Sequence, residues 1–181
     1  PAQPLKTKKA QQTPIKALTR EELEKLLKAL PDEPRQVAIL AAFTGMRKSE
    51  LQALRWGDVD LTERTLTIVK SKNKKIRTLY MTDRVYDVLM RIKSGSLPHP
   101  QLKILHHADI KRSLHTAGMQ VGIGHVHMHM LRHTFATLMR DEGVPLDRIM
   151  EALGHSSMDM VLRYAKARPQ QLKEAFAALD G

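Results

Sequence analysis

Apolar residues recur at helical spacing along most of the chain, and this periodicity constrains the fold more than any other feature. The first stripe, Leu23 to Leu30, follows a capping box that runs from Thr19 to Glu22. Pro31 and Pro34 are expected to end this first helix and delay the next. Further stripes predict helices over about 35–43, 47–54, 82–92, 110–118, 129–138, 145–154, 156–165 and 172–179, with glycines closing those that end at 118 and 154.

Only one part of the chain has the composition and alternation of β-strands. Residues 65–69 alternate in polarity, residues 76–81 are β-prone, and a polar, lysine-rich segment separates them. We therefore predict a hairpin with a cationic tip. The expected fold class is mainly α with a small antiparallel β-sheet (α+β).

Residues 1–16 lack periodicity and are rich in Pro, Gln and Lys, which predicts a basic linker or tail. Residues 17–181 are enough for one domain with a core. Because no Met opens the sequence, we expect a fragment of a longer protein. The absence of cysteine excludes disulfides, thiolate zinc sites and cysteine nucleophiles, and it fits a cytoplasmic protein.

The charge points to a polyanionic partner. Thirty Lys and Arg against nineteen Asp and Glu give a formal net charge of +11, and such an excess favours phosphate binding through counterion release. Aromatic residues make up only 4% of the chain, so stacking on single-stranded bases fits poorly and duplex DNA fits better. The plainer alternative is a solvated basic surface.

Two arginines are candidates for binding a phosphate, which accepts paired hydrogen bonds from guanidinium groups. Arg47 follows a Gly-Met break at the start of a short helix. Arg132 lies three residues after His129, so we expect both to project outward while Leu131 and Phe135 anchor their helix. Taken singly, each arginine is more simply explained as a surface or ion-pair residue.

Tyr164 is the candidate nucleophile among three tyrosines. Tyr80 lies in a strand and Tyr86 at a helix start, where ordinary packing explains both. Tyr164 falls off its helix's apolar stripe, between Arg163 and Lys166. Nearby cations favour the phenolate form of a phenol, which otherwise is a poor nucleophile.

The histidines raise the possibility of a metal site, which we do not expect. His129 and His133 have the spacing of two zinc ligands on a helix, but Met130 stands where the motif needs a glutamate. Arg132 between them would repel a divalent ion. His129 suits a general acid or base acting on a phosphate better, and no phosphate-binding loop for a nucleotide cofactor is found.

Three segments of the sequence decide between these alternatives. They are TGMRKSEL with ALRWGDVD (44–51 and 53–60), HMLRHTFAT (129–137), and LGHSS through RYA (153–157 and 163–165). In this order, with the basic hairpin between the first two, they resemble the catalytic domain of the tyrosine recombinases, the phage integrase type. The resemblance extends from about residue 17 to the end and implies the fold shared with type IB topoisomerases.

The resemblance implies a role for each matching residue. Arg47 and Arg132 would bind the scissile phosphate, and Tyr164 would attack it to form a 3′-phosphotyrosine. Lys72 would protonate the leaving 5′ oxygen, and His129 would relay a proton or act as base. The remaining family positions are His155, which would hydrogen-bond the phosphate, and Glu50, which would support an arginine.

The hairpin is also expected to contact DNA. Lys70, Lys74, Lys75 and Arg77 would bind the backbone there, and His133 would do so from its helix. Lys72 matches the family through the pattern Lys-x-x-Lys-x-Arg, but another register would give the catalytic role to Lys70 or Lys74.

The resemblance further implies double-stranded DNA as partner, a tetramer on paired sites and no cofactor. The family's N-terminal DNA-binding domain has no counterpart here. The segment 168–181 would either pack on a neighbouring protomer or fold back. The alternatives are a type IB topoisomerase, a non-catalytic DNA-binding protein with the same fold, and a basic RNA-binding domain, which explains the charge but not the three segments.

Overall fold

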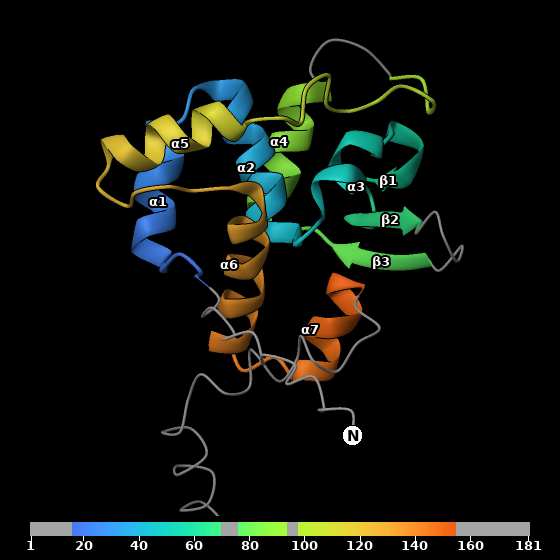
Figure 1. The fold of residues 1–181 in the computed structure, drawn as a ribbon. Helices are drawn as coiled ribbons and strands as arrows, with labels where there is room; N and C mark the ends of the chain where they lie inside the picture. Colours follow the sequence, from blue (N-terminus) through green and yellow to red (C-terminus); the bar gives the residue numbers. More distant parts are fainter. Residues whose placement is uncertain (1–15, 70–75, 94–97, 155–181) are drawn as a thin grey trace, which may run out of the picture.

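The computed structural model describes residues 16–69, 76–93 and 98–154. Within these ranges the chain is mostly helical, with one small sheet (Figure 1). The elements in chain order are α1 (Arg20–Ala29), α2 (Asp32–Thr44), α3 (Lys48–Ala53), the 3-10 helix η1 (Trp56–Asp58), β1 (Val59–Asp60), β2 (Thr65–Val69), β3 (Ile76–Tyr80), α4 (Asp83–Lys93), α5 (Lys111–Gln120), α6 (Met128–Asp141) and α7 (Leu146–Leu153). This confirms the predicted fold class. None of the described helices is long and apolar enough to cross a membrane.

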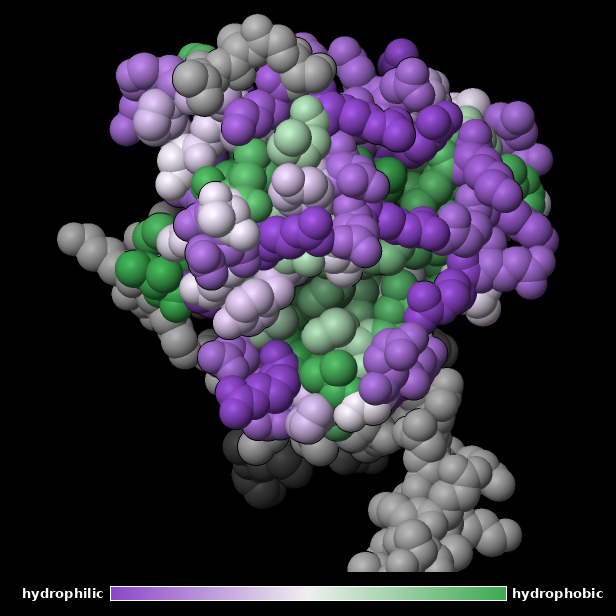
Figure 2. All heavy atoms as spheres, turned by 180° about the vertical axis from the view of Figure 1, so that it is seen from behind, coloured by the Kyte–Doolittle hydropathy of each residue, from purple (hydrophilic) through white to green (hydrophobic). Residues whose placement is uncertain are grey.

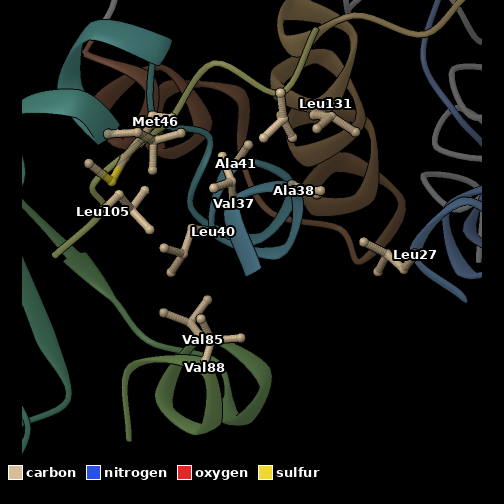
Figure 3. Packing of buried hydrophobic residues seen from close by; sticks show 14 of the residues in the cluster. Leu27, Val37, Ala38, Leu40, Ala41, Met46, Val85, Val88, Leu105 and Leu131 are labelled. Carbon is tan, nitrogen blue, oxygen red and sulfur yellow. The ribbon is translucent and has the colours of Figure 1, made fainter. Parts of the chain in front are cut away.

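Helix α2 forms the centre of the core. It packs against α1, α3, α4 and α6, and its side chains Leu40 and Ala41 are completely buried. Figure 3 shows Val85 and Val88 of α4 on one side of Leu40, and Leu131 of α6 on the other side of α2. Burying a leucine of this kind contributes about 2 kcal/mol to folding, so this layer fixes the frame on which the charged residues are held.

The predicted capping box begins α1. The hydroxyl of Thr19 accepts the Glu22 N–H at 3.1 Å, and the Glu22 carboxylate accepts the Thr19 N–H at 2.8 Å. The expected interruption by Pro34 is wrong, because α2 starts at Asp32 and contains this proline in its first turn. The first N–H groups of a helix have no partner inside it, so a proline there removes no hydrogen bond.

Gly118 does not end α5 as expected, since the helix continues to Gln120. A Cβ at Gly118 would lie 2.4 Å from the Gly124 carbonyl oxygen and 2.8 Å from a Val126 methyl carbon. The glycine therefore permits the chain after α5 to pass closely over the helix. Gly154 does end α7 as predicted, in the left-handed conformation with φ 63°.

The antiparallel strand pair of the predicted hairpin is confirmed, and a short strand adds to it, whereas the predicted cationic tip lies outside the described residues. The sheet has the antiparallel order β1-β2-β3, in which Thr67 pairs with Thr78 and Ile68 with Arg77. Strand β1 is only two residues long, too short for an alternating pattern to predict it. In β3 the buried positions are Arg77 and Leu79, so the arginine faces the interior.

The sheet and α7 meet on one side of the molecule. Figure 1 shows α7 beside β3, with α3 above the sheet, and contacts join α7 to β3 and α3 to α2. Figure 2 shows the opposite face, where hydrophilic side chains surround a hydrophobic patch. Segments distant in sequence thus come together here, and two of them, α3 with its N-cap and β3, carry Arg47, Glu50 and Arg77.

Candidate active site

Arg47 lies at the N-cap of α3, immediately after a tight turn. Gly45 makes this turn with φ 64°, and a Cβ there would lie 2.4 Å from the ring of Phe135. Only glycine accommodates both the backbone conformation and the contact. The Arg47 side chain is one third exposed, at 33%, so the turn presents its guanidinium at the surface.

Arg132 does not project outward as expected. Its residue is only 2% exposed, and its guanidinium donates hydrogen bonds to the carbonyl oxygens of Gly45 and, at 2.6 Å, of Leu153. The arginine joins the turn before Arg47 to the end of α7. The predicted anchoring of α6 by Leu131 and Phe135 is confirmed, since both are buried.

Despite this burial, Arg132 lines the same cleft as Arg47 and His129. The cleft measures about 520 Å³, and its walls come from α3 and from the start of α6. Its lining residues are Met46, Arg47, Lys48, Ser49, Gln52, Met128, His129 and Arg132. A larger cavity of about 690 Å³ lies between β3 and α7, but it contains neither Arg47 nor Arg132. The smaller cleft is therefore the candidate site.

His129 has an exposed position at the beginning of α6, where its ring meets the edge of the His133 ring with 4.4 Å between the centroids. Its pKa is lowered from the usual value by partial burial of the ring, and further by the charges of Arg132, His127 and Arg47. Each of these effects disfavours the imidazolium form. The surroundings of His129 thus favour the neutral imidazole, the form that can accept a proton.

Glu50 binds two arginines at once. One carboxylate oxygen accepts the Arg47 N–H at 2.7 Å, and the other lies 3.1 Å from the Arg47 guanidinium. Arg77 donates to both oxygens, at 3.0 and 2.8 Å. Burial alone raises the pKa of Glu50, but the hydrogen bonds from Arg77 and the Arg47 backbone, together with both positive charges, bring it to about 2. The expected support of an arginine by Glu50 agrees with this geometry.

Arg77 does not fit its expected role as a DNA contact. Its side chain is 8% exposed, and besides the bonds to Glu50 it donates from Nε to the Ala152 carbonyl oxygen at 2.8 Å. A signal for this position existed in the sequence. Strand alternation places Arg77 on the same face as Leu79, and that face packs into the protein.

Other expected site residues lie outside the described residues: Lys70, Lys72, Lys74, Lys75, His155 and Tyr164. The described residues end next to these positions, since β2 ends at Val69, β3 begins at Ile76, and Gly154 directly precedes His155.

His133 is partly buried beside His129. Tyr80 is not packed as expected but 78% exposed at the end of β3, whereas the Arg64 guanidinium covers the Tyr86 ring at 4.3 Å.

No group of three or more His, Asp or Glu residues within 16–69, 76–93 and 98–154 is close enough to hold a metal ion. His115 and His125 lie on the exposed surface with 2.9 Å between their Nδ1 atoms, and the His127 ring centroid lies 6.0 Å from that of His125. The charged and titratable groups that line the cleft are instead the guanidinium groups of Arg47 and Arg132, the ammonium group of Lys48 and the imidazole of His129. Such groups suit an anion.

Comparison with known proteins identifies the family. The model of the phage integrase family matches residues 16–171, which is most of the chain and includes all three of the segments described above. The chain belongs to the phage integrase family. This confirms the resemblance to the catalytic domain of tyrosine recombinases.

Individual relatives agree with the family assignment. Tyrosine recombinase XerA from Thermococcus kodakarensis is 32% identical over 190 residues, which cover 96% of this chain and 66% of the relative. The catalytic domain of bacteriophage HP1 integrase matches with a TM-score of 0.69 and 26% identity, over 90% of this chain and 94% of that domain. XerH site-specific recombinase, solved in complex with a palindromic difH substrate, matches with a TM-score of 0.72 and 25% identity, over 93% of this chain and 54% of XerH.

The chain spans only part of its curated relatives. It covers 65%, 66% and 52% of the XerA proteins from three archaea. The domain solved for HP1 integrase, in contrast, is matched nearly throughout. The shared region is therefore the catalytic domain.

Proposed function

We propose that this chain catalyses site-specific recombination of double-stranded DNA by cutting and rejoining strands through a 3′-phosphotyrosine at Tyr164. The observation that carries the proposal is the cleft shared by Arg47, His129 and Arg132 in a member of the phage integrase family. The net charge of +11 and the DNA bound to XerH support duplex DNA as the substrate.

In this proposal the two arginines supply the charge that phosphoryl transfer needs. Arg47 and Arg132 bind the non-bridging oxygens of the scissile phosphate and stabilise the extra negative charge of the transition state. His155 adds a hydrogen bond to the same oxygens. Two guanidinium groups and an imidazole perform this task without a metal ion or a nucleotide.

Proton transfer completes the step. The Tyr164 oxygen forms a bond to phosphorus as the bond from phosphorus to the 5′ oxygen breaks. His129 accepts the phenol proton, which its lowered pKa allows near neutral pH, and Lys72 gives a proton to the leaving oxygen. The phosphotyrosine keeps the energy of the phosphodiester, so attack by a 5′ hydroxyl rejoins the strands by the reverse route.

The setting of the reaction is part of the proposal. The enzyme acts in the cytoplasm as a homo-oligomer, a tetramer on two paired sites, and integrates or excises a phage or mobile element. Residues 1–16 link this domain to a further DNA-binding domain, and residues 168–181 either pack on a neighbouring protomer or fold back on their own domain.

A suicide substrate tests the chemistry. A nick next to the scissile phosphate lets the cleaved fragment diffuse away, so that a covalent protein–DNA adduct accumulates. We expect the full chain to form this adduct, Tyr164→Phe to abolish it, and the control Tyr86→Phe to retain it. Peptide mapping should locate the DNA on Tyr164.

Two outcomes would contradict the proposal. DNA binding without any adduct would make the chain a non-catalytic DNA-binding protein. An adduct combined with relaxation of supercoils, but with no strand exchange between paired sites, would make it a type IB topoisomerase.

A further inference from the structure

Arg77 is a buried cation in the middle of the candidate catalytic elements. It projects from β3 into the interior, where all three guanidinium nitrogens donate hydrogen bonds. Nη1 and Nη2 donate to the two Glu50 oxygens, and Nε donates to the Ala152 carbonyl oxygen. It therefore connects the start of α3, the second strand of the hairpin and the end of α7. A side chain so engaged is not available to bind DNA.

The charges of this cluster do not cancel. Glu50 contributes one negative charge, while Arg47 and Arg77 contribute two positive charges. If Arg77 were absent, Glu50 and Arg47 would form a neutral pair. With Arg77 present, one positive charge remains. This charge lies on Arg47, whose side chain is 33% exposed in the cleft, because the Arg77 side chain is turned inward and only 8% exposed.

Arg77 also fixes the geometry of the end of α7. The last carbonyl groups of a helix lack partners within it and carry partial negative charge. Arg77 binds the Ala152 carbonyl, while Arg132 binds that of Leu153. A Cβ at Gly154 would lie 2.8 Å from an Arg77 nitrogen, so the chain passes directly over the guanidinium on its way to His155.

We propose that Arg77 is a positioning residue for DNA cleavage: it holds the Glu50 carboxylate and offsets its charge, so that Arg47 keeps its own positive charge for the scissile phosphate. This proposal rests on the proposed function and names a residue that acts on the phosphate through Arg47. It predicts that Arg77 matters most when the substrate carries its full negative charge.

The first test compares two suicide substrates, one with the natural scissile phosphate and one with a methylphosphonate, whose non-bridging methyl group removes the charge. We expect Arg77→Met in the full chain to slow single-turnover cleavage of the phosphate by about thirtyfold, less than the hundredfold typical of a direct charge donor. On the methylphosphonate the loss should shrink to about threefold or less, because less charge needs stabilising. The control Arg148→Met removes an exposed guanidinium from α7 and should affect both substrates by less than twofold.

A second variant separates this role from a fold defect. Arg77→Met leaves the buried Glu50 with one partner fewer, which can destabilise the protein. The double variant Glu50→Gln/Arg77→Met removes both charges, so that no carboxylate at position 50 neutralises Arg47. It should cleave the phosphate faster than Arg77→Met alone. A purely structural role predicts that the double variant is equally slow or slower.

Three results would overturn the proposal. The first is an equal loss on both substrates, which means a general defect. The second is a loss of rate that disappears only when sulfur replaces the 5′ bridging oxygen. Because the sulfur leaves without a proton, this result would mean that Arg77 acts through Lys72. The third is a double variant no faster than Arg77→Met.

A binding measurement keeps the proposal separate from the proposed function. In Tyr164→Phe, which cannot cleave, the preference for a charged phosphate over a methylphosphonate at the scissile position is measured as a ratio of Kd values. We expect Arg77→Met to reduce this ratio about threefold. An unchanged ratio contradicts the role of Arg77 whether or not the wild-type chain forms an adduct, whereas a missing adduct with a reduced ratio contradicts only the proposed catalysis.

Discussion

In the core around α2 nearly all buried side chains are apolar, apart from Thr44 and Thr134, whereas the region where α3, β3, α6 and α7 meet buries two arginines, one of which binds the Glu50 carboxylate. Apolar burial is favourable for almost any close packing and tolerates changes that keep volume. A buried ion pair is often no more stabilising than apolar residues of the same volume, but each of its charges requires a defined partner at a defined position. The core therefore supplies most of the stability of the domain, and the charged region sets the geometry of the site.

The largest expected effect is in the core. Leu40→Ala should lower the free energy of unfolding by about 4 kcal/mol, because it removes a fully buried side chain and leaves a cavity. Urea denaturation measures this loss, and Leu102→Ala, at a position 56% exposed, is the control. The cleavage rate of the folded fraction should not change. A rate that falls with stability would break the proposed division between the two regions.

The next effect is the acid sensitivity of the charged region. The pKa of Glu50 is about 2 in the folded protein, against 4.5 ordinarily, so the carboxylate contributes about 3 kcal/mol of stability above pH 4.5. This contribution is lost as the pH falls from 4.5 towards 2. Urea denaturation at pH 7 and pH 3 should therefore show a smaller loss for Glu50→Gln than for the wild type. Parallel losses would mean that the Arg77 and Arg47 bonds do not hold the carboxylate in solution.

The smallest of the three effects concerns Arg132. Lysine cannot reach both the Gly45 and the Leu153 carbonyl oxygens while also facing the cleft, so Arg132→Lys should slow cleavage by about a hundredfold, roughly 2.7 kcal/mol. Single-turnover cleavage of the suicide substrate measures this effect. Arg140→Lys, further along the same helix, is the matched control and should cleave normally. A full rate for Arg132→Lys would show that charge alone, rather than the planar fork, is what the site needs.

The elements of the fold were largely predictable from local patterns. The capping box at Thr19, the alternation in 65–69 and the stop at Gly154 depend on neighbours within a few residues, and the structure confirms each one. The failures at Pro34 and Gly118 have another origin. The first was a misjudged helix start, and the second depends on a contact with Gly124 and Val126 that local sequence does not contain.

The site was predictable as a set of residues but not as an arrangement. The order of the three segments identified Arg47, His129 and Arg132 as candidates, and these do share a cleft. The burial of Arg132, the exposure of Tyr80 and the inward direction of Arg77 were not foreseen. For Arg77 the alternation of β3 carried the signal, but a basic residue beside a lysine-rich turn favoured the surface interpretation.

The sequence by itself determined the helical periodicity, the position of the hairpin and the membership of the family, because each is encoded in residue types at fixed spacing. Only the tertiary structure decided which cations face the cleft and which are buried as supports. That decision depends on partners far away in the chain, such as Glu50 for Arg77 and Leu153 for Arg132. A guanidinium is stable in the interior only where several hydrogen-bond acceptors surround it, and only folding brings these acceptors together.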